Sequence, residues 1–406
     1  MLNIKWLSKY IYPVLLASIL GFSILLRFLL LDIPGGDFYS YKRAVEQFGE
    51  GTNPYYETIE SFENKNSRLE HGYAYFPTLL YIQYIILVFS NIVDTEKSAI
   101  IFWKLPTIFA EYAILYLLIK ESKSKALNVM VAIFWLISPY FLARFEYSFY
   151  DPLFLFFLLL ALKQQQLTTT RSAIYYAIAI SLKTIPVIVA PLFLVNLVDK
   201  RSINKILKFA GGFFIVFLLI SLPFFKSTRD LSVYFTGSVL VHSERAVQGR
   251  PFLTTASYLL QNNGINFNQH ELVNVYAIMA MLFALVIPTV LYLKGLLKSK
   301  YAWTTLAFVI YLFVTPVLSR SHLMWFVPFF LAYLIEKNFD NKKVAVSLVS
   351  IWLSLFIYLL TWNNGFEPYT NSKNLPVLKS GEKRWVFEKV TRQKYYEYRG
   401  KLLDFK

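Results

Sequence analysis

The chain has 406 residues, of which 56% are hydrophobic and 18% aromatic, and it contains no cysteine. A soluble protein of this length does not carry so many uninterrupted apolar runs, so the composition indicates an all-α polytopic membrane protein. The formal net charge of +16 is typical of lysine-rich cytoplasmic loops, and we expect no nucleic-acid partner. The lack of cysteine excludes disulfides and thiolate metal sites.

The first apolar run predicts an uncleaved membrane span over roughly Tyr10–Leu31. Lys5 and Lys9 precede this run and place the N-terminus in the cytoplasm. The loop that follows therefore begins on the outer side of the membrane, and its excess of acidic residues agrees with that side.

A short amphipathic helix is predicted directly after the first span, in the sequence IPGGDFYSYKRAVEQF. Its apolar side chains Phe38, Tyr41, Val45 and Phe48 recur at helical spacing and share one face. We interpret this segment as a helix lying on the membrane surface, with Asp37 at its N-terminus. Aspartate is also a favoured N-cap residue, which is the structural alternative to a chemical role for this side chain.

The next apolar run, Tyr73–Val93, decides the topology of the remaining chain. If it crossed the bilayer, the lysine-rich loops between the later spans would all lie outside, against the positive-inside rule. We therefore predict that it lies in the outer interface as a second juxtamembrane helix, which suits its tyrosines and its early proline, Pro77. The first outer loop, with its juxtamembrane helices, then covers residues 32–98.

The remaining apolar runs bring the total to about 11 transmembrane helices. A second long outer loop is predicted over residues 226–270, and a basic tail over residues 362–406 follows the membrane-embedded domain, residues 1–361. Several runs are shorter than the roughly 20 residues of a full crossing, which is tolerable where the outer face is hollowed. The runs are Ile100–Ile119, Ala126–Leu142, Pro152–Leu162, Ser172–Leu182, Ile185–Val198, Ile206–Phe225, Leu272–Leu293, Ala302–Leu318, Leu323–Ile335 and Val344–Thr361.

Charged and histidine side chains collect at the predicted outer ends of these spans. Ionisable groups are costly at membrane depth and usually mark functional sites. One acid at a constrained turn, together with several cations, suits transfer of a group from a lipid phosphate. The acid accepts a proton from a hydroxyl, and the cations stabilise the charge on the departing phosphate. The members of this set are Asp37, Glu146, Asp151, Lys183, His242, Glu244, Arg245, Arg250, Arg320 and His322.

Three parts of the chain resemble known enzymes. The segment DFYSYKRAVEQFGEGTNPYYE, followed by YAYFPTLLY, resembles the first outer loop of the GT-C superfamily of glycosyltransferases. FWKLPTIFAEYAILYLLI resembles the next span of that superfamily. TPVLSRSHLMWFVP resembles a late segment of glycosyltransferase family 87, the polyprenol-phosphate-mannose-dependent mannosyltransferases, and also the catalytic subunit of GPI mannosyltransferase I.

This resemblance implies a GT-C-like fold and an inverting glycosyltransferase. The expected donor is a polyprenyl- or dolichyl-phosphate sugar, with mannose as the expected sugar, and the acceptor is a hydroxyl of a glycolipid or glycan. Matching the motifs gives Asp37 the role of catalytic base and makes His322 the late histidine, while Lys183 matches a K..P hairpin. We expect Lys183, Arg245, Arg250 and Arg320 to bind the donor phosphate, and the substrate cavity to include Tyr41, Tyr75, Glu146, Asp151 and His242.

The expected location is the plasma membrane, or the ER membrane in a eukaryote, with the active site on the outer or luminal side. The chain reads GGDFY where the related enzymes that bind a metal carry DxD, so we expect no cofactor, although a divalent metal is compatible with this chemistry. Structural alternatives exist for the cations: Lys183 and Arg320 as anchors at span ends, and His322 as a packing residue.

Two other functions compete with this interpretation. A lipid or solute transporter or flippase would also contain intramembrane charges such as Arg27, Lys104 and Glu111. Such proteins usually show internal repeats with matching broken helices, and we find no such repeat. A non-catalytic assembly subunit is the other alternative, and it would not need acids and cations gathered at the outer face.

Overall fold

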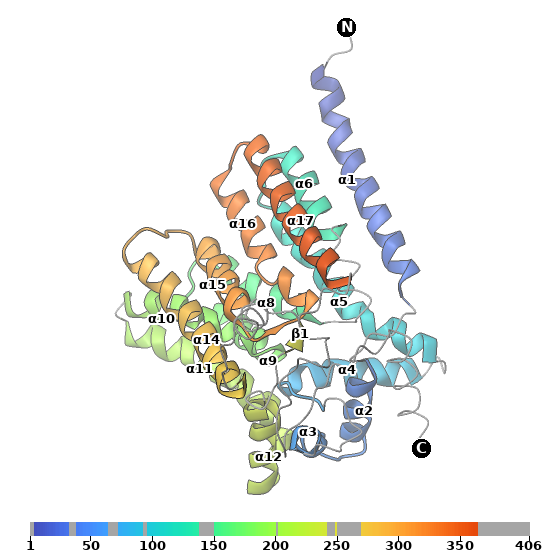
Figure 1. Cartoon of the computed structure of the whole chain (residues 1–406), viewed down its shortest axis with the longest axis vertical. Coiled ribbons are helices and arrows are strands. Elements are labelled where there is room, and N and C mark those ends of the chain that lie inside the picture. The colour runs from blue at the N-terminus through green and yellow to red at the C-terminus, as the bar shows by residue number, and fades with distance from the viewer. Residues whose placement is uncertain are drawn as a thin grey trace, which may run out of the picture.

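The computed structural model describes most of the chain and is almost entirely helical in the described part, as the composition predicts (Figure 1). Asp37, Glu146, His242, Arg245 and Arg250 lie outside the described residues, as does the tail beyond Asn363. The described residues are 4–31, 38–63, 72–91, 96–137, 150–199, 202–241, 248–249 and 269–363.

Helix α1 (Ile4–Leu29) corresponds to the first predicted span, and most of its apolar surface is exposed, as expected for a helix in contact with lipid. Two short helices follow, α2 (Phe38–Gly49) and α3 (Tyr55–Glu63). Next comes α4 (Pro77–Asn91), which is too short for a full crossing. In Figure 1 α4 lies across the direction of α1. This arrangement is consistent with the interfacial placement predicted for Tyr73–Val93.

The apolar stripe of α2 is buried, as its helical spacing predicts, but it is covered by protein. Phe38 and Val45 are inaccessible to solvent, and Tyr41 is nearly so. Phe38 packs edge-on against the ring of Trp103, and the helix as a whole packs on α4. The apolar face of α2 is therefore covered by protein, and the position of this helix at the membrane surface remains a prediction.

The other predicted spans also appear as helices, several with a break or an added turn. Among the described residues, four segments are long and apolar enough to cross a membrane, namely Tyr10–Leu29, Ile100–Ile119, Ile203–Phe224 and Val275–Leu293. The total of about 11 spans remains a prediction. The elements are α5 (Glu96–Ile119), α6 (Lys125–Leu136), α8 (Asp151–Lys163), α9 (Thr170–Leu182), η1 (Ile185–Val189), α10 (Ala190–Asp199), α11 (Ile203–Ser221), η2 (Leu222–Phe224), α12 (Thr228–Ser238), α14 (Gln269–Leu293), α15 (Lys300–Val314), η4 (Arg320–Met324), α16 (Val327–Lys337) and α17 (Asn341–Asn363).

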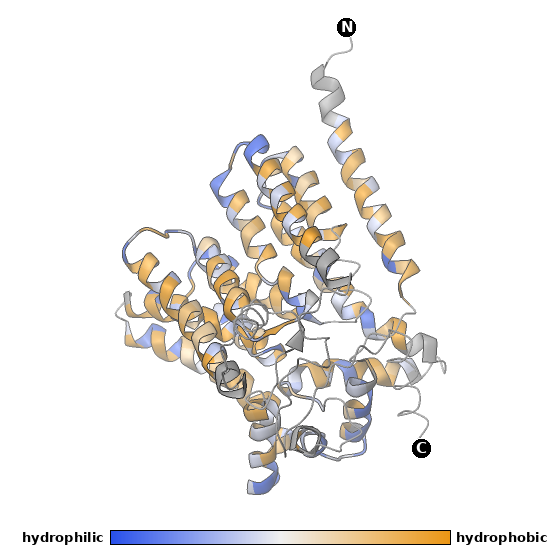
Figure 2. Ribbon diagram, viewed as in Figure 1, coloured by the Kyte–Doolittle hydropathy of each residue, from blue (hydrophilic) through white to orange (hydrophobic). Residues whose placement is uncertain are grey.

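Polar side chains define where several of these helices begin and end. The hydroxyls of Ser124, Thr169 and Ser299 each accept a hydrogen bond from a backbone N–H in the first turn of α6, α9 and α15. Asn338 ends α16 in the left-handed conformation, with φ of 47°. Figure 2 shows that hydrophilic residues lie mainly at the ends of these helices and hydrophobic residues along their length.

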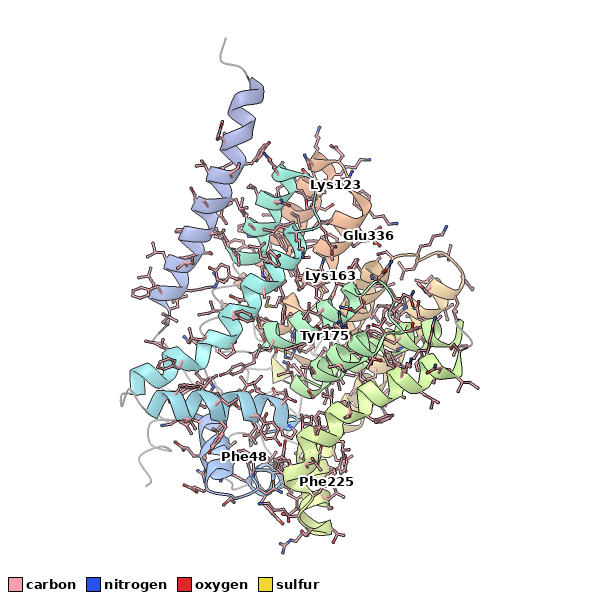
Figure 3. All side chains as sticks on the ribbon, turned by 180° about the vertical axis from the view of Figure 1, so that it is seen from behind. Phe48, Lys123, Lys163, Tyr175, Phe225 and Glu336 are labelled. Carbon is pink, nitrogen blue, oxygen red and sulfur yellow. The ribbon has the colours of Figure 1, made fainter. Side chains whose placement is uncertain are left out.

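The lysine-rich loops gather at one end of the helix bundle. Lys163, at the end of α8, forms an ion pair with Glu121 at 2.7 Å. Lys300 donates from Nζ to the carbonyl oxygen of Gln164 at 3.2 Å, and the Ser299 hydroxyl donates to the Glu336 carboxylate. Figure 3 shows Lys123, Lys163 and Glu336 on this part of the molecule. One shared end for these loops agrees with the predicted cytoplasmic side.

At the opposite end, the two predicted outer loops pack against each other through aromatic rings. The Tyr55 ring lies 5.4 Å from that of Tyr234 in α12, which stacks on Phe224 at 5.2 Å between centroids. Tyr55 also donates its hydroxyl to the carbonyl oxygen of Tyr75 at 2.6 Å. Burial raises the pKa of Tyr55 and Tyr73 well above the ordinary tyrosine value, so both hydroxyls remain protonated. Phe48 and Phe225 lie in this region of Figure 3.

Candidate active site

Asp151 is the centre of a buried polar cluster at the end of the bundle away from the lysine-rich loops. It is the first residue of α8 and is 3% exposed. Its Oδ1 atom lies 2.5 Å from Nζ of Lys183, and its Oδ2 atom accepts a hydrogen bond from Nε1 of Trp325 at 2.8 Å. Each carboxylate oxygen therefore has a protein partner, which offsets the cost of burying its charge.

Lys183 reaches Asp151 because α8 and α9 pack side by side as consecutive helices joined by a short turn. Such a hairpin brings the start of α8 and the end of α9 to the same level. Lys183 is the C-cap residue of α9, with extended backbone angles of −158° and 134°. The chain leaves the helix at this point and turns the side chain toward Asp151.

Two aromatic rings lie beside the ammonium group of Lys183. Nζ lies 4.7 Å from the ring centroid of Trp325 and 5.9 Å from that of Phe154, both within the range of cation–π attraction. The side chain nevertheless keeps 15% of its surface exposed. A lysine held in this way presents a compact positive charge with a fixed position, which suits binding of a phosphate oxygen.

His322 lies against the same tryptophan. Its ring centroid is 4.1 Å from that of Trp325, and its Nδ1 accepts a hydrogen bond from the backbone N–H of Ser319 at 3.2 Å. A neutral histidine that accepts at Nδ1 carries its proton on Nε2. The 3₁₀ turn η4 therefore fixes both the ring plane of His322 and the nitrogen that can donate a proton or a hydrogen bond.

A chain of aromatic contacts links this cluster to α2. Tyr150, the residue before Asp151, donates its hydroxyl to the backbone carbonyl of Trp103 at 2.9 Å. Its ring lies 6.0 Å from that of Tyr41, which is 6.0 Å from the ring of Tyr75. Asp37 directly precedes Phe38, the first residue of α2. The helix that begins directly after Asp37 is therefore packed against the residues next to Asp151.

A short parallel strand pair brings part of the second predicted outer loop to the same region. Strand β1 (Gln248–Gly249) pairs with β2 (Val317–Leu318), which comes just before η4. The predicted cations Arg245 and Arg250 flank β1 in the sequence, and Arg320 and His322 come after β2. Arg320 begins η4, and only its backbone is described.

The described part of the chain thus unites three of the predicted site residues, Asp151, Lys183 and His322. It also contains Tyr41 and Tyr75, which lie among the aromatic residues beside the cluster. Sequence reasoning did not predict Trp325 as a site residue. The signal for it is chemical, because a buried indole N–H normally needs an acceptor. Within the described residues, no group of three or more histidine, aspartate and glutamate side chains is arranged to hold a metal.

Comparison with known families identifies the family to which the chain belongs. The model of glycosyltransferase family 87 matches residues 73–320, which is more than half of the chain. The chain belongs to glycosyltransferase family 87. No curated protein and no solved structure matches it. As a family 87 protein with several apolar helices, it is a membrane glycosyltransferase, and the resemblance found in the sequence is confirmed.

The matched range contains Asp151 and Lys183 and ends at Arg320. It begins after Asp37 and stops short of His322, so the match does not cover either of the two residues with predicted catalytic roles. Those roles depend on the local sequence motifs and on the geometry around Trp325 and α2.

Proposed function

We propose that this family 87 enzyme transfers a sugar, with mannose as the first candidate, from a polyprenyl- or dolichyl-phosphate donor to a hydroxyl of a glycolipid or glycan on the outer side of the membrane. The observation that carries the proposal is the placement of Lys183. This partly exposed lysine is held by Asp151 and Trp325 and shares one aromatic neighbour with His322.

The reaction is a single displacement with inversion at the anomeric carbon. Asp37 takes the proton of the acceptor hydroxyl while the oxygen of that hydroxyl forms the new bond to the anomeric carbon. The bond from that carbon to the phosphate oxygen breaks, and polyprenyl phosphate leaves with the additional negative charge. Lys183 and the Nε2–H of His322 stabilise this charge, because both are fixed before the reaction begins.

The cations of the outer loops complete the donor site in this proposal. Arg245 and Arg250 flank a strand that pairs directly before Arg320 and His322, so the loop enters the region where the phosphate of the donor would lie. The polyprenyl chain would run along the exposed apolar surfaces of the spans, since such surface is otherwise covered only by lipid.

A transfer assay in proteoliposomes with a panel of polyprenyl-phosphate sugars tests the donor class and the sugar. Asp37→Asn tests the base, because it keeps the shape and the capping ability of aspartate but loses its basicity. We expect kcat to fall by roughly 10²-fold or more, with little change in donor KM.

Asp230→Asn is the matched control. Asp230 lies in the first turn of α12, on the predicted outer side, and its carboxylate accepts a hydrogen bond from the hydroxyl of Ser227. That hydrogen bond is the main cause of the lowered pKa of Asp230. This variant should transfer sugar like the wild type. Near-normal turnover by Asp37→Asn would exclude Asp37 as the base.

A further inference from the structure

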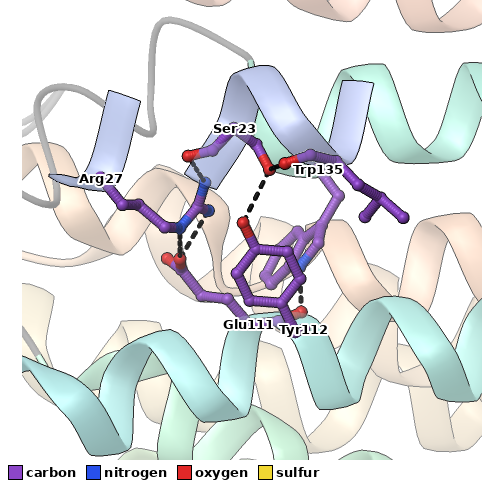
Figure 4. A network of polar contacts seen from close by, with 6 residues as sticks. Ser23, Arg27, Glu111, Tyr112 and Trp135 are labelled. Atoms are coloured by element: carbon purple, nitrogen blue, oxygen red, sulfur yellow. Dashed lines mark hydrogen bonds and ion pairs between the residues drawn. The ribbon is translucent and has the colours of Figure 1, made fainter. Parts of the chain in front are cut away.

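Helix α1 is joined to α5 by a buried ion pair that the proposed chemistry does not use (Figure 4). Nε and Nη2 of Arg27 donate to Oε2 of Glu111 at 2.9 and 2.6 Å, and Nη1 donates to the backbone carbonyl of Ser23 at 3.0 Å. Arg27 is 2% exposed and Glu111 is 0% exposed. This burial leaves no access for a substrate, so the pair is not a binding site.

Two further polar contacts lie on either side of the ion pair. The Ser23 hydroxyl and the Tyr112 hydroxyl are 2.7 Å apart, and Lys104 donates from Nζ to the carbonyl oxygen of Leu30 at 2.6 Å. Ser23 and Arg27 are four residues apart and lie on one face of α1, and Leu30 directly follows the last residue of that helix. The last turns of α1 are therefore joined to α5 at three successive levels.

Such contacts have a specific value for a helix in lipid. Lipid chains are as apolar as leucine, so an apolar helix gains little from one axial position over another. A buried ion pair is also a weak source of stability, because apolar residues of similar size often stabilise as well. The directional bonds of Arg27 and Glu111 instead supply a single register of α1 against α5.

The register matters because the end of α1 leads directly into the segment that carries Asp37. The connection from α1 to α2 spans residues 30–37 and ends at Asp37. At one end of this connection, Lys104 binds the carbonyl of Leu30; at the other, Phe38 packs on Trp103 at 5.2 Å. Trp103 and Lys104 are consecutive residues of α5, so both ends of the connection are attached to the same turn of that helix.

We propose that the Arg27–Glu111 pair and Lys104 set the register of α1 against α5 and thereby position the connection that carries Asp37. This positioning role depends on the proposed function of Asp37 as the base. A slip of α1 by one helical turn would displace its end by about 5.4 Å, whereas a catalytic group must be placed within about 0.5 Å. Even a displacement of about 1 Å lowers turnover by about 10²-fold.

The double variant Arg27→Met/Glu111→Met tests the proposal, because it removes both charges and leaves no unpaired buried charge. We expect a folded protein whose donor KM stays within about twofold of the wild type and whose kcat falls by about tenfold or more. The charge-reversed variant Arg27→Glu/Glu111→Arg should recover part of this loss. The matched control is Glu121→Gln/Lys163→Met, which removes an ion pair between α8 and the turn after α5 at the other end of the bundle and should behave like the wild type.

Register itself can be measured without any activity. The chain contains no cysteine, so spin labels can be placed at Phe28 and Tyr116, whose side chains are exposed on α1 and α5. We expect the distance distribution between the labels to shift or broaden in the Arg27→Met/Glu111→Met background and to remain unchanged in the control. An unchanged distribution would overturn the register role, and a changed distribution with wild-type kcat would overturn its link to catalysis. The assignment of Asp37 as the base is tested separately, because it fails if the Asp37→Asn enzyme remains active.

Discussion

The Asp151–Lys183 pair makes a quantitative prediction about stability. We consider Asp151→Asn, Lys183→Met and the double variant. Lys183→Met removes the ion pair of the buried Asp151 carboxylate and keeps its hydrogen bond from the indole N–H of Trp325. Asp151→Asn leaves a Lys183 side chain that is 15% exposed and whose ammonium group lies over the Trp325 ring. The Lys183→Met variant should therefore be the less stable of the two single variants.

The loss in free energy of unfolding for each variant depends on the environment of the charge that remains. Breaking a buried ion pair by removing one partner costs about 3–5 kcal/mol. For Asp151→Asn the cost should be nearer ~2 kcal/mol, because the cation–π contact with Trp325 contributes about 1–2 kcal/mol and is retained. The double variant leaves no unpaired charge. Its loss in free energy of unfolding should therefore be close to that of Asp151→Asn alone. The two changes should thus be non-additive by about 3–5 kcal/mol.

Equilibrium unfolding in mixed SDS and detergent micelles, followed by tryptophan fluorescence, would measure this coupling. The pair Glu121–Lys163 is the control, because Glu121 is 57% exposed and its coupling should be below about 1 kcal/mol. A coupling below about 0.5 kcal/mol for Asp151 and Lys183 would refute the idea that the two charges stabilise each other in the folded protein.

Three other predictions concern the topology, the packing and the proposed donor site. An impermeant maleimide should label Asp94→Cys from the outside and Ser124→Cys only after permeabilisation; labelling of Asp94→Cys only from the cytoplasm would mean that α4 crosses the membrane. Gly72→Ala should destabilise the protein by about 1–3 kcal/mol in the same unfolding assay, since its Cβ would lie 2.2 Å from the Cα of Thr58. His322→Ala should mainly lower kcat, and Arg250→Ala should mainly raise donor KM; wild-type kinetics in both would remove these residues from the site.

Hydrophobic patterning was sufficient to predict most of the helices. The burial of Phe38 and Val45 agrees with their spacing, and α5 ends at Ile119 as its apolar run predicts. Patterning could not say whether protein or lipid covers a buried face, so the packing of α2 on protein was not foreseen. Helix α12 was also missed, because a polar sequence inside a long loop gives a weak periodic signal.

The sequence was sufficient to predict which ionisable residues belong to the candidate site, but not which of them contact one another. Asp151, Lys183 and His322 stand out as ionisable groups at span ends. That Asp151 would bind both Lys183 and Trp325 depends on how α8, α9 and η4 pack, and Trp325 lies 174 residues beyond Asp151. No local pattern in the sequence contains that information.

The short distance between Asp151 and Lys183 along the chain has a consequence for biogenesis. Only 32 residues separate them, and the helices between them form one hairpin. During synthesis this hairpin can enter the bilayer as a unit, with the carboxylate and the ammonium already neutralising each other. Insertion of either charge alone would cost several kcal/mol. The translocon would therefore meet a helical hairpin in which Asp151 and Lys183 are already paired, well before the ribosome reaches Trp325.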